Sequence, residues 1–153
     1  MVGKDEEEVL AEMEKAYKYP LTKDQWEAAL KEGRLLGIKC KECGAVTAPP
    51  FSVCQRCQTP FRDFEVVELS GKGEIMSYTV IYVPPEGLEP PYIVAFVKTD
   101  EGPWIPARLD VDPERAQKEF LVGKKVTFKE AAVLPGDKHS AGDRICPLFT
   151  LAE

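Results

Sequence analysis

The first residues of the chain show the hydrophobic spacing of an amphipathic helix. Val9, Met13 and Tyr17 lie four residues apart, and glutamates at 6–8 stand where the positive end of a helix dipole favours acidic side chains. The apolar stripe is narrow for a helix that packs in a core. We therefore predict a helix over 5–17 that docks either on the rest of its own chain or on another molecule.

A second helix is predicted to begin after Thr22. Thr22 and Gln25 have the spacing of a capping box, in which each side chain binds the backbone N–H of the other residue. Leu21 and Trp26 occupy the two positions of a hydrophobic staple. Gly33 is the residue type that most often ends a helix in the left-handed conformation. Residues 1–33 are therefore expected to form an N-terminal helical segment.

From residue 63 onward the pattern predicts β-strands. Runs of β-forming residues are separated by turn residues, and the run at 92–99 is apolar at almost every position. Asp112 and Pro113 are typical of the first residues of a short helix, which is expected to end at Glu119. The predicted strands cover residues 64–69, 74–83, 92–99, 104–109, 125–133 and 145–151.

The order of these elements predicts a barrel. The first two runs flank the glycine-containing segment 70–73 and count as one bent strand, so the short helix falls between the third and fourth strands. That order is typical of a five-stranded OB-fold barrel. We therefore expect a mainly β protein with N-terminal helices, in which residues 63–153 form the OB-fold domain.

The composition is ordinary for a globular protein. The chain has 153 residues, of which 44% are hydrophobic, enough for one compact unit or a small domain with an appendage. Its apolar runs are too short to span a bilayer, and its N-terminus lacks the apolar core of a signal peptide. We therefore expect a cytoplasmic protein.

Charge is distributed unevenly along the chain. Residues 1–33 have five basic and nine acidic side chains, residues 34–62 have five and one, and residues 63–153 have ten and sixteen. The three net charges are −4, +4 and −6, which sum to the −6 of the whole chain. Because affinity for nucleic acid comes largely from neutralised phosphates, an acidic main body argues against nucleic-acid binding.

The basic middle segment contains two Cys-x-x-Cys pairs. Cys40 and Cys43 form the first pair, Cys54 and Cys57 the second, and Gly44 follows the first pair where a positive φ is often needed. Two such turns brought together by a short hairpin provide the four thiolates of a tetrahedral zinc site. Since no coordination position stays open, we predict one structural Zn²⁺ in a zinc ribbon that spans residues 34–62.

Other uses of the four cysteines fit the sequence less well. Disulfides are unusual in a reducing cytosol, and a thiol redox centre needs a single pair in a thioredoxin-like setting. A rubredoxin-like iron centre uses similar turns, but ten residues between the pairs is a short separation for one. The cysteines alone do not decide whether zinc or iron occupies the site.

The remaining candidate side chains do not form a catalytic set. Cys146 lies in a strand pattern and is interpreted as a packing residue. His139 is the only histidine, lies in the polar loop 136–143 and has no partner that the sequence identifies. The chain also lacks a nucleophile elbow, a phosphate loop and a dinucleotide fingerprint. We therefore predict that this chain is not itself an enzyme.

Eight short motifs of the chain occur together in one known family. They run from the end of the second predicted helix to the fourth barrel strand, so that they extend over nearly the whole chain. The motifs are Gly33-Arg34-Leu35, Cys40-x-x-Cys43-Gly44, Pro49-Pro50, Cys54-x-x-Cys57, Gly71-x-Gly73-Glu74-Ile75-x-Ser77-Tyr78-Thr79-Val80, Pro91-Tyr92-Ile93-Val94-Ala95, Asp100-Glu101-Gly102 and Val122-Gly123-Lys124-Lys125-Val126.

With these motifs the sequence resembles the DUF35 family, acyl-CoA-associated OB-fold proteins with a rubredoxin-like zinc ribbon. The cysteine spacing alone is shared with many ribbons, so the specificity of the resemblance comes from its combination with the barrel motifs. Two positions depart from the family's pattern. Phe51 stands where the family often has arginine, which removes one phosphate contact, and Gln55 stands where proline is common.

The resemblance implies a non-catalytic accessory or scaffold protein. Family members resemble subunits that accompany thiolase-like condensing enzymes in lipid, polyketide or isoprenoid-precursor metabolism. In archaeal isoprenoid synthesis they look like bridges between acetoacetyl-CoA thiolase and hydroxymethylglutaryl-CoA (HMG-CoA) synthase. CoA or acyl-CoA is then a candidate ligand.

The basic side chains of the predicted ribbon are the candidate contacts to such partners. Lys39, Lys41, Arg56 and Arg62 are expected to bind CoA phosphates or an acidic partner surface. The alternative is a solvated face that balances the charge of the zinc site. The proline-rich loop 84–91 is expected either to line a pocket or interface or to serve as a rigid connector.

Two rival functions follow from the same architecture. OB-fold barrels and zinc ribbons both commonly bind nucleic acid, although the acidic barrel and the absence of an obvious row of aromatic and basic residues oppose that function here. The other rival is a small acyl-CoA enzyme such as a thioesterase or hydratase. Turnover of acyl-CoA by the pure protein would identify it.

Overall fold

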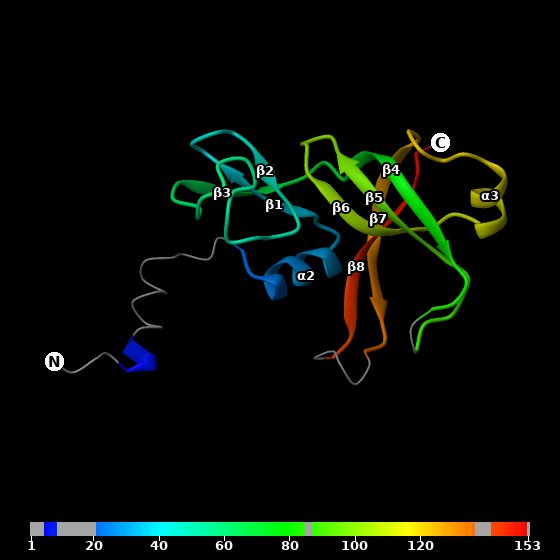
Figure 1. The fold of residues 1–153 in the computed structure, drawn as a ribbon, viewed down its shortest axis with the longest axis horizontal. Helices are drawn as coiled ribbons and strands as arrows, with labels where there is room; N and C mark the ends of the chain where they lie inside the picture. The colour runs from blue at the N-terminus through cyan, green and yellow to red at the C-terminus, as the bar shows by residue number, and fades with distance from the viewer. Residues whose placement is uncertain (1–4, 9–20, 85–86, 137–141, 153) are drawn as a thin grey trace.

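The computed structural model describes residues 5–8, 21–84, 87–136 and 142–152. Residues 6–8 are helical, and the Asp5 carboxylate accepts a hydrogen bond from the Glu8 N–H at 2.8 Å, as expected where the first predicted helix begins. Its remaining part, at 9–20, lies outside the described residues. The described chain then forms a helix, a three-stranded sheet and a closed barrel (Figure 1).

The second predicted helix is confirmed as α2, Lys23–Lys31. Both bonds of the capping box are present: the Gln25 N–H donates to the Thr22 hydroxyl at 3.1 Å, and the Thr22 N–H donates to the Gln25 side chain at 3.0 Å. Gly33 has a φ of 85°, the left-handed conformation that ends the helix. Trp26 is buried, and its indole N–H donates to the Leu36 carbonyl at 2.9 Å, which ties α2 to the sheet that follows.

The three-stranded sheet belongs to the cysteine segment. Its order is β2-β1-β3, all antiparallel, and β1 is the strand that leads into the first cysteine pair. The strands are β1 (Leu36–Cys40), β2 (Val46–Thr47) and β3 (Phe64–Glu68).

The prediction that the run at 64–69 is the first half of a bent barrel strand is wrong. This run forms β3 and pairs with β1 over five residues, and the Leu69 N–H then donates to the Leu35 carbonyl at 2.8 Å. The chain turns at Gly71, which has a φ of 78°, before the barrel begins. The run pairs with β1 because β1 has a free backbone edge, and the sequence of the run alone does not indicate which edge it will pair with. The division of the chain after residues 33 and 62 stays a prediction.

The barrel has five strands, as predicted, in the closed order β4-β5-β6-β8-β7. Neighbouring strands are antiparallel except β6 and β8, which are parallel, and α3 (Pro113–Lys118) connects β6 to β7 with Asp112 as its N-cap. This is the order expected for an OB-fold. The strands are β4 (Lys72–Ile81), β5 (Tyr92–Thr99), β6 (Trp104–Leu109), β7 (Lys125–Leu134) and β8 (Arg144–Leu151).

One glycine permits β4 to approach β5 closely. A Cβ atom on Gly73 would lie 2.5 Å from the carbonyl oxygen of Lys98, a distance that real side chains do not reach. At the same end of β5, Gly102 has a φ of 119° and closes the predicted hairpin turn to β6. A close backbone approach and a positive φ explain why glycine occurs at these two positions.

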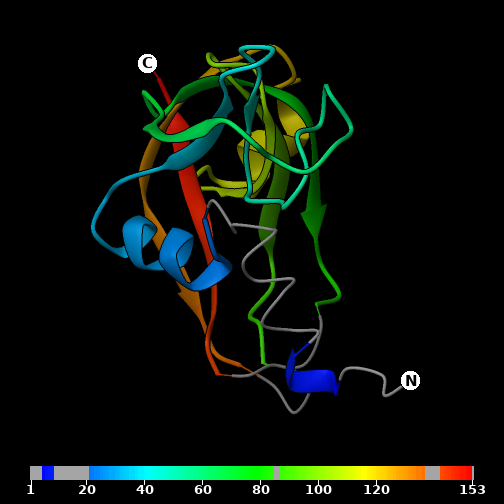
Figure 2. The same cartoon turned by 90° about the vertical axis from the view of Figure 1, so that its left-hand side faces the viewer.

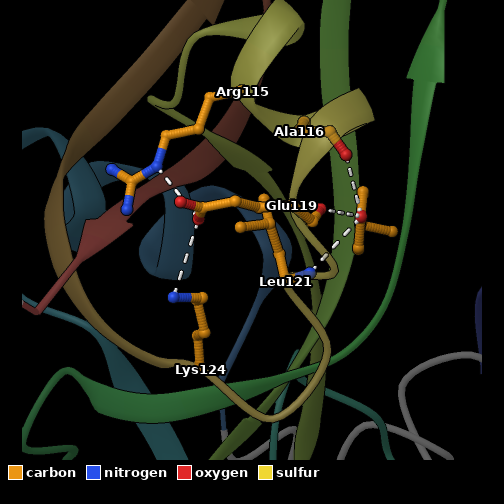
Figure 3. Close-up of polar contacts among 6 residues, drawn as sticks. Arg115, Ala116, Glu119, Leu121 and Lys124 are labelled. Carbon is orange, nitrogen blue, oxygen red and sulfur yellow. Dashed lines mark hydrogen bonds and ion pairs between the residues drawn. The ribbon is translucent and has the colours of Figure 1, made fainter.

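A tyrosine on β4 holds α3 and the segment after it against the barrel. The Tyr78 hydroxyl lies 2.9 Å from the Ala116 carbonyl and 3.0 Å from the Glu119 carbonyl, and the Leu121 N–H points to it at 3.4 Å (Figure 3). The single hydroxyl proton can be donated to only one carbonyl at a time. Figure 3 also shows the Glu119 carboxylate between two cations, Arg115 at 3.1 Å and Lys124 at 3.6 Å.

One hydrophobic core connects the helix, the sheet and the barrel. α2 packs on β1 and on the barrel strands β7 and β8, and Figure 2, seen from the ribbon side, shows the helix beside β8. The fully buried side chains of this core come from all three parts and include Leu30, Leu35, Ile38, Ile75, Val126 and Phe149. None of the helices in the described residues is both long and apolar enough to cross a membrane.

Candidate metal centre and outer face of the barrel

The first cysteine pair closes a tight backbone turn. The Cys40 N–H donates to the Ala45 carbonyl at 2.9 Å, and the Gly44 N–H donates back to the Cys40 carbonyl at 2.7 Å. Gly44 has a φ of 79°, as the sequence led us to expect. This turn places the Cys43 side chain beside that of Cys40.

The second pair repeats this geometry with a different residue at the critical position. The Cys54 N–H donates to the Thr59 carbonyl at 3.0 Å, and the Gln58 N–H donates to the Cys54 carbonyl at 2.8 Å. Gln58 occupies the place of Gly44 and has a φ of 57°, the only positive φ of a non-glycine residue in the described chain. Sequence reasoning missed this position, because glutamine does not indicate a left-handed conformation.

The four cysteine sulfurs converge on one point. The Sγ atoms of Cys40, Cys43, Cys54 and Cys57 all lie within 4.8 Å of one another. Two of the separations are 3.9 Å, between Cys40 and Cys57, and 3.6 Å, between Cys43 and Cys54. Zn–S bonds of about 2.3 Å put sulfurs at the corners of a tetrahedron about 3.8 Å apart. Both the donor set and its dimensions therefore fit a structural zinc ion.

Hydrogen bonds from the backbone and between the thiols give these thiols unequal acidity. A backbone hydrogen bond from Ala45 lowers the pKa of the Cys43 thiol to about 7. The hydrogen bond between the Cys57 thiol and the Cys43 sulfur instead raises the pKa of Cys57 to about 12. One thiolate therefore forms near neutral pH, and a bound cation is needed to deprotonate the set fully.

The four basic residues singled out in the sequence all lie exposed on the cysteine segment. Lys39 is on β1. The backbone N–H of Lys41 donates to the carbonyl of Asp63 at 2.9 Å, and because Arg62 precedes Asp63 in the chain, this bond brings the first cysteine turn close to Arg62. Arg56 lies on the second cysteine turn. None of the ion pairs among the described residues includes any of the four. Their contacts to CoA or to a partner stay a prediction.

A second feature, which the sequence did not reveal, is a hollow of about 470 Å³ on the outside of the barrel. It lies over β4, β5 and β6 and is bounded by the ends of β7 and β8 and by the β4–β5 connection. Most of its lining is apolar. The residues are Ser77, Tyr78, Thr79, Leu88, Tyr92, Val94, Ala95, Phe96, Pro106, Ala107, Arg108, Leu134 and Cys146.

Two residues of this lining bear on earlier expectations. Leu88 comes from the proline-rich loop, of which residues 85–86 are not described, so this loop does contribute to the wall of a pocket. Cys146 is half-buried in the wall, and burial raises the pKa of its thiol, which agrees with a packing residue. His139 lies outside the described residues.

An arginine is the principal charged group of the hollow. The guanidinium of Arg108 lies over the ring of Tyr92, 4.3 Å from the ring centre, in a cation–π contact. None of the ion pairs among the described residues includes Arg108. The hollow therefore combines apolar walls with one positive charge that has no carboxylate partner in the described chain.

Two family descriptions match adjoining parts of the chain. A model described as the rubredoxin-like zinc ribbon domain of ChsH2 matches residues 28–60. A model described as the C-terminal OB-fold domain of ChsH2 matches residues 66–129. The zinc ribbon description agrees with the sulfur geometry and supports a structural zinc ion over iron or disulfides.

Several curated relatives are more than a third identical to this chain over the aligned residues. A "DUF35 domain-containing scaffold protein" of Methanocaldococcus jannaschii is 37% identical over 52% of this chain and 58% of its own length. A protein with the same description from Pyrococcus furiosus is 37% identical over 68% of this chain and 76% of its own length. The "Benzoylsuccinyl-CoA thiolase subunit BbsA" of Geobacter metallireducens is 36% identical over 56% of this chain and 58% of its own length.

A solved structure has the same architecture. A chain of the "Ltp2-ChsH2(DUF35) aldolase" superposes with a TM-score of 0.61 and 30% sequence identity. The match covers 84% of this chain and 92% of that chain, so that it extends over both the ribbon and the barrel.

Proposed function

Because this chain belongs to the DUF35 family, we propose that it is a non-catalytic accessory protein that binds a thiolase-type condensing enzyme. The observation that carries this proposal is the similarity to a subunit of a thiolase, together with the similarity to scaffold proteins of the same family. The solved relative, described as part of an aldolase with Ltp2, supports a role beside another protein.

The metal centre supports a structural part for the ribbon in this role. Cys40, Cys43, Cys54 and Cys57 are the residues that would hold zinc, and the bound ion would neutralise thiolates and cross-link the two cysteine turns. With four protein ligands the ion has no open position for substrate. The chain's own residues then present the basic ribbon surface and the barrel face to a partner.

The finer proposal names the partners and the ligand. The chain would bridge acetoacetyl-CoA thiolase and HMG-CoA synthase in the cytoplasm, and Lys39, Lys41, Arg56 and Arg62 would contact CoA phosphates or acidic partner residues. The exposure of these four cations, and the absence of ion pairs to them among the described residues, supports that use. An acyl-CoA ligand is the corresponding small-molecule proposal.

The experiment that tests this function is purification of the tagged chain from its native cell extract at moderate salt. We expect a thiolase-type enzyme in a fixed stoichiometric ratio, identified by peptide mass, with HMG-CoA synthase in the same complex if the bridging proposal holds. The purified chain alone should not turn over acyl-CoA substrates. Recovery of the chain without any condensing enzyme, or acyl-CoA turnover by the chain itself, would contradict the proposal.

A further inference from the structure

Between Ile93 and Val97 the strand β5 is apolar on both of its faces. Ile93 and Val97 point into the barrel and are 1% and 0% exposed, whereas Val94 and Phe96 alternate with them and point outward. Phe96 is 48% exposed. Strands that are apolar on both faces are typical of sheets covered on both sides. The sequence of β5 therefore suits a strand whose outer face is covered, yet Phe96 on that face is half-exposed and no described helix packs on it.

The neighbouring strand β6 continues the same surface. Trp104 and Pro106 point outward between the buried residues Ile105 and Ala107, and Trp104 is 51% exposed. The described helices α2 and α3 do not cover this side, since the main contacts of α2 are with β1, β7 and β8 and those of α3 are with β4 (Figure 1). We use the name outer face for five of the outward residues of β5 and β6, which are Val94, Phe96, Trp104, Pro106 and Arg108.

The hollow lies within the outer face and has the form of a socket for apolar side chains. Val94 pairs with Arg108 and Phe96 with Pro106 across the two strands, so these four residues form its floor, while Leu134 and Leu88 contribute to its sides. Interfaces between proteins obtain most of their affinity from a few large side chains buried in such pockets. The hollow therefore offers an anchoring position for a protein partner.

Two arginines provide positive charge at the outer face and beside it. Arg108 lies in the hollow, and none of the ion pairs among the described residues includes it. At the ribbon end, Arg56, Glu101 and Trp104 line a second hollow of about 470 Å³, between the second cysteine turn and the β5–β6 turn, and the Glu101 carboxylate accepts a hydrogen bond from the Ser70 N–H at 3.0 Å. A partner with a carboxylate beside its apolar anchor would be complementary to Arg108 in the first hollow, and Arg56 adds a second cation in the second hollow.

We propose that the outer face is the surface through which this chain binds the thiolase-type enzyme, which inserts an apolar side chain into the hollow and places carboxylates beside Arg108 and Arg56. The inference rests on the function proposed above and adds to it the site of contact. The proposed contact surface extends from the outer face of the barrel to the second hollow at the ribbon, where Arg56 contacts the partner protein.

Nucleic acid is the alternative ligand of the outer face that an OB-fold suggests. OB-fold barrels bind single strands on this side, and Tyr92, Phe96 and Trp104 together with Arg108 are side chains on which bases can stack. The net charge of −6 over residues 63–153 opposes this occupant, because a strand of phosphates needs a basic groove. The apolar walls of the hollow also favour a protein anchor over a phosphate backbone.

The test compares two substitutions at strand positions with similar exposure. Phe96→Glu places a charge in the hollow, whereas Val133→Glu changes a residue of β7 that is 52% exposed and points to the opposite face from Leu134. The thiolase-type enzyme recovered with the wild-type chain is purified and titrated with each variant. We expect affinity to fall by about ten-fold or more for Phe96→Glu and to stay near the wild-type value for Val133→Glu.

Two further measurements keep the test decisive. Zinc content and thermal midpoint must match the wild type in both variants, and Trp104→Thr provides a second outer-face variant if Phe96→Glu does not fold. Equal affinity of all variants would overturn the outer-face proposal and leave the accessory function standing. Salt-sensitive binding of a single-stranded oligonucleotide that Phe96→Glu abolishes would also overturn it. Failure of the wild-type chain to recover any condensing enzyme would overturn both proposals.

Discussion

At the second cysteine turn, a glutamine holds a backbone conformation that a glycine holds at the first. Gly44 and Gln58 each follow the second cysteine of a pair, have φ values of 79° and 57°, and donate their N–H to the first cysteine of that pair. For residues with a Cβ atom the left-handed conformation costs roughly 1 to 2 kcal/mol. The metal centre therefore contains a strained position that the equivalent turn avoids.

Exchanging the residue types at these two positions should have opposite effects on stability. Gln58→Gly should raise the free energy of unfolding of the zinc-loaded protein and Gly44→Gln should lower it, each by about 1 kcal/mol. A Cβ atom on Gly44 would have no atom within 4 Å, so the loss there would come from the backbone alone. Guanidinium denaturation of both variants measures the difference. A lower stability of Gln58→Gly would mean that the glutamine side chain contributes more than its backbone conformation costs.

At the scale of elements, α3 depends on one side chain of the barrel. The Tyr78 hydroxyl is the shared partner of the Ala116 and Glu119 carbonyls and of the Leu121 N–H, which are groups at the end of the helix that the helix itself does not satisfy. A helix of six residues is too short to be stable alone. Its position at the end of the barrel therefore comes from this contact and from the buried Ala116.

Tyr78→Phe should remove the contact while keeping the ring in place. We expect the free energy of unfolding to fall by about 1 to 2 kcal/mol, because backbone groups near the core lose their partner. Hydrogen exchange should quicken at Leu121, whose N–H donates to this hydroxyl. Tyr92→Phe is the matched control, since the ring face that contacts Arg108 is retained. Equal effects of the two variants would show that Tyr78 acts through its ring and not through its hydroxyl.

At the scale of the whole molecule, the ribbon and the barrel have different sources of stability. The ribbon consists of three short strands and two cysteine turns, so that the zinc site supplies much of its folding free energy. The barrel is closed, with paired strands all round and its own buried residues such as Ile105 and Phe149. Removal of the metal should therefore affect the two parts unequally.

Cys54→Ser should abolish zinc binding and loosen the ribbon. We expect zinc near zero per chain by elemental analysis, faster hydrogen exchange in β1 and β3, and slow exchange retained in β5, which pairs with two barrel strands. Cys146→Ser is the control, because Cys146 lies in the wall of the barrel hollow and should leave one zinc per chain. One zinc per chain in Cys54→Ser would contradict the assignment of the four ligands.

Local patterns predicted most elements and the metal centre. The capping box of α2, the Asp112–Pro113 start of α3 and the bounds of β5 and β6 agree with the structure, because each depends on residues close together in the chain. The four cysteines were predictable for the same reason, since each pair is a local turn. Gln58 was not, because its conformation follows from the hydrogen bonds of the turn and not from its residue type.

The sequence by itself determined the converging cysteines, the helix caps and the barrel strands apart from the start of the first, since spacing and residue type specify these within a few residues. Only the tertiary structure decided that 64–68 pairs with β1, and that side chains from all five barrel strands and the β4–β5 connection surround one hollow. Strand pairing depends on which distant backbone edge is free, and a hollow on what several strands leave unfilled. Both are properties of segments far apart in the chain, which no local pattern records.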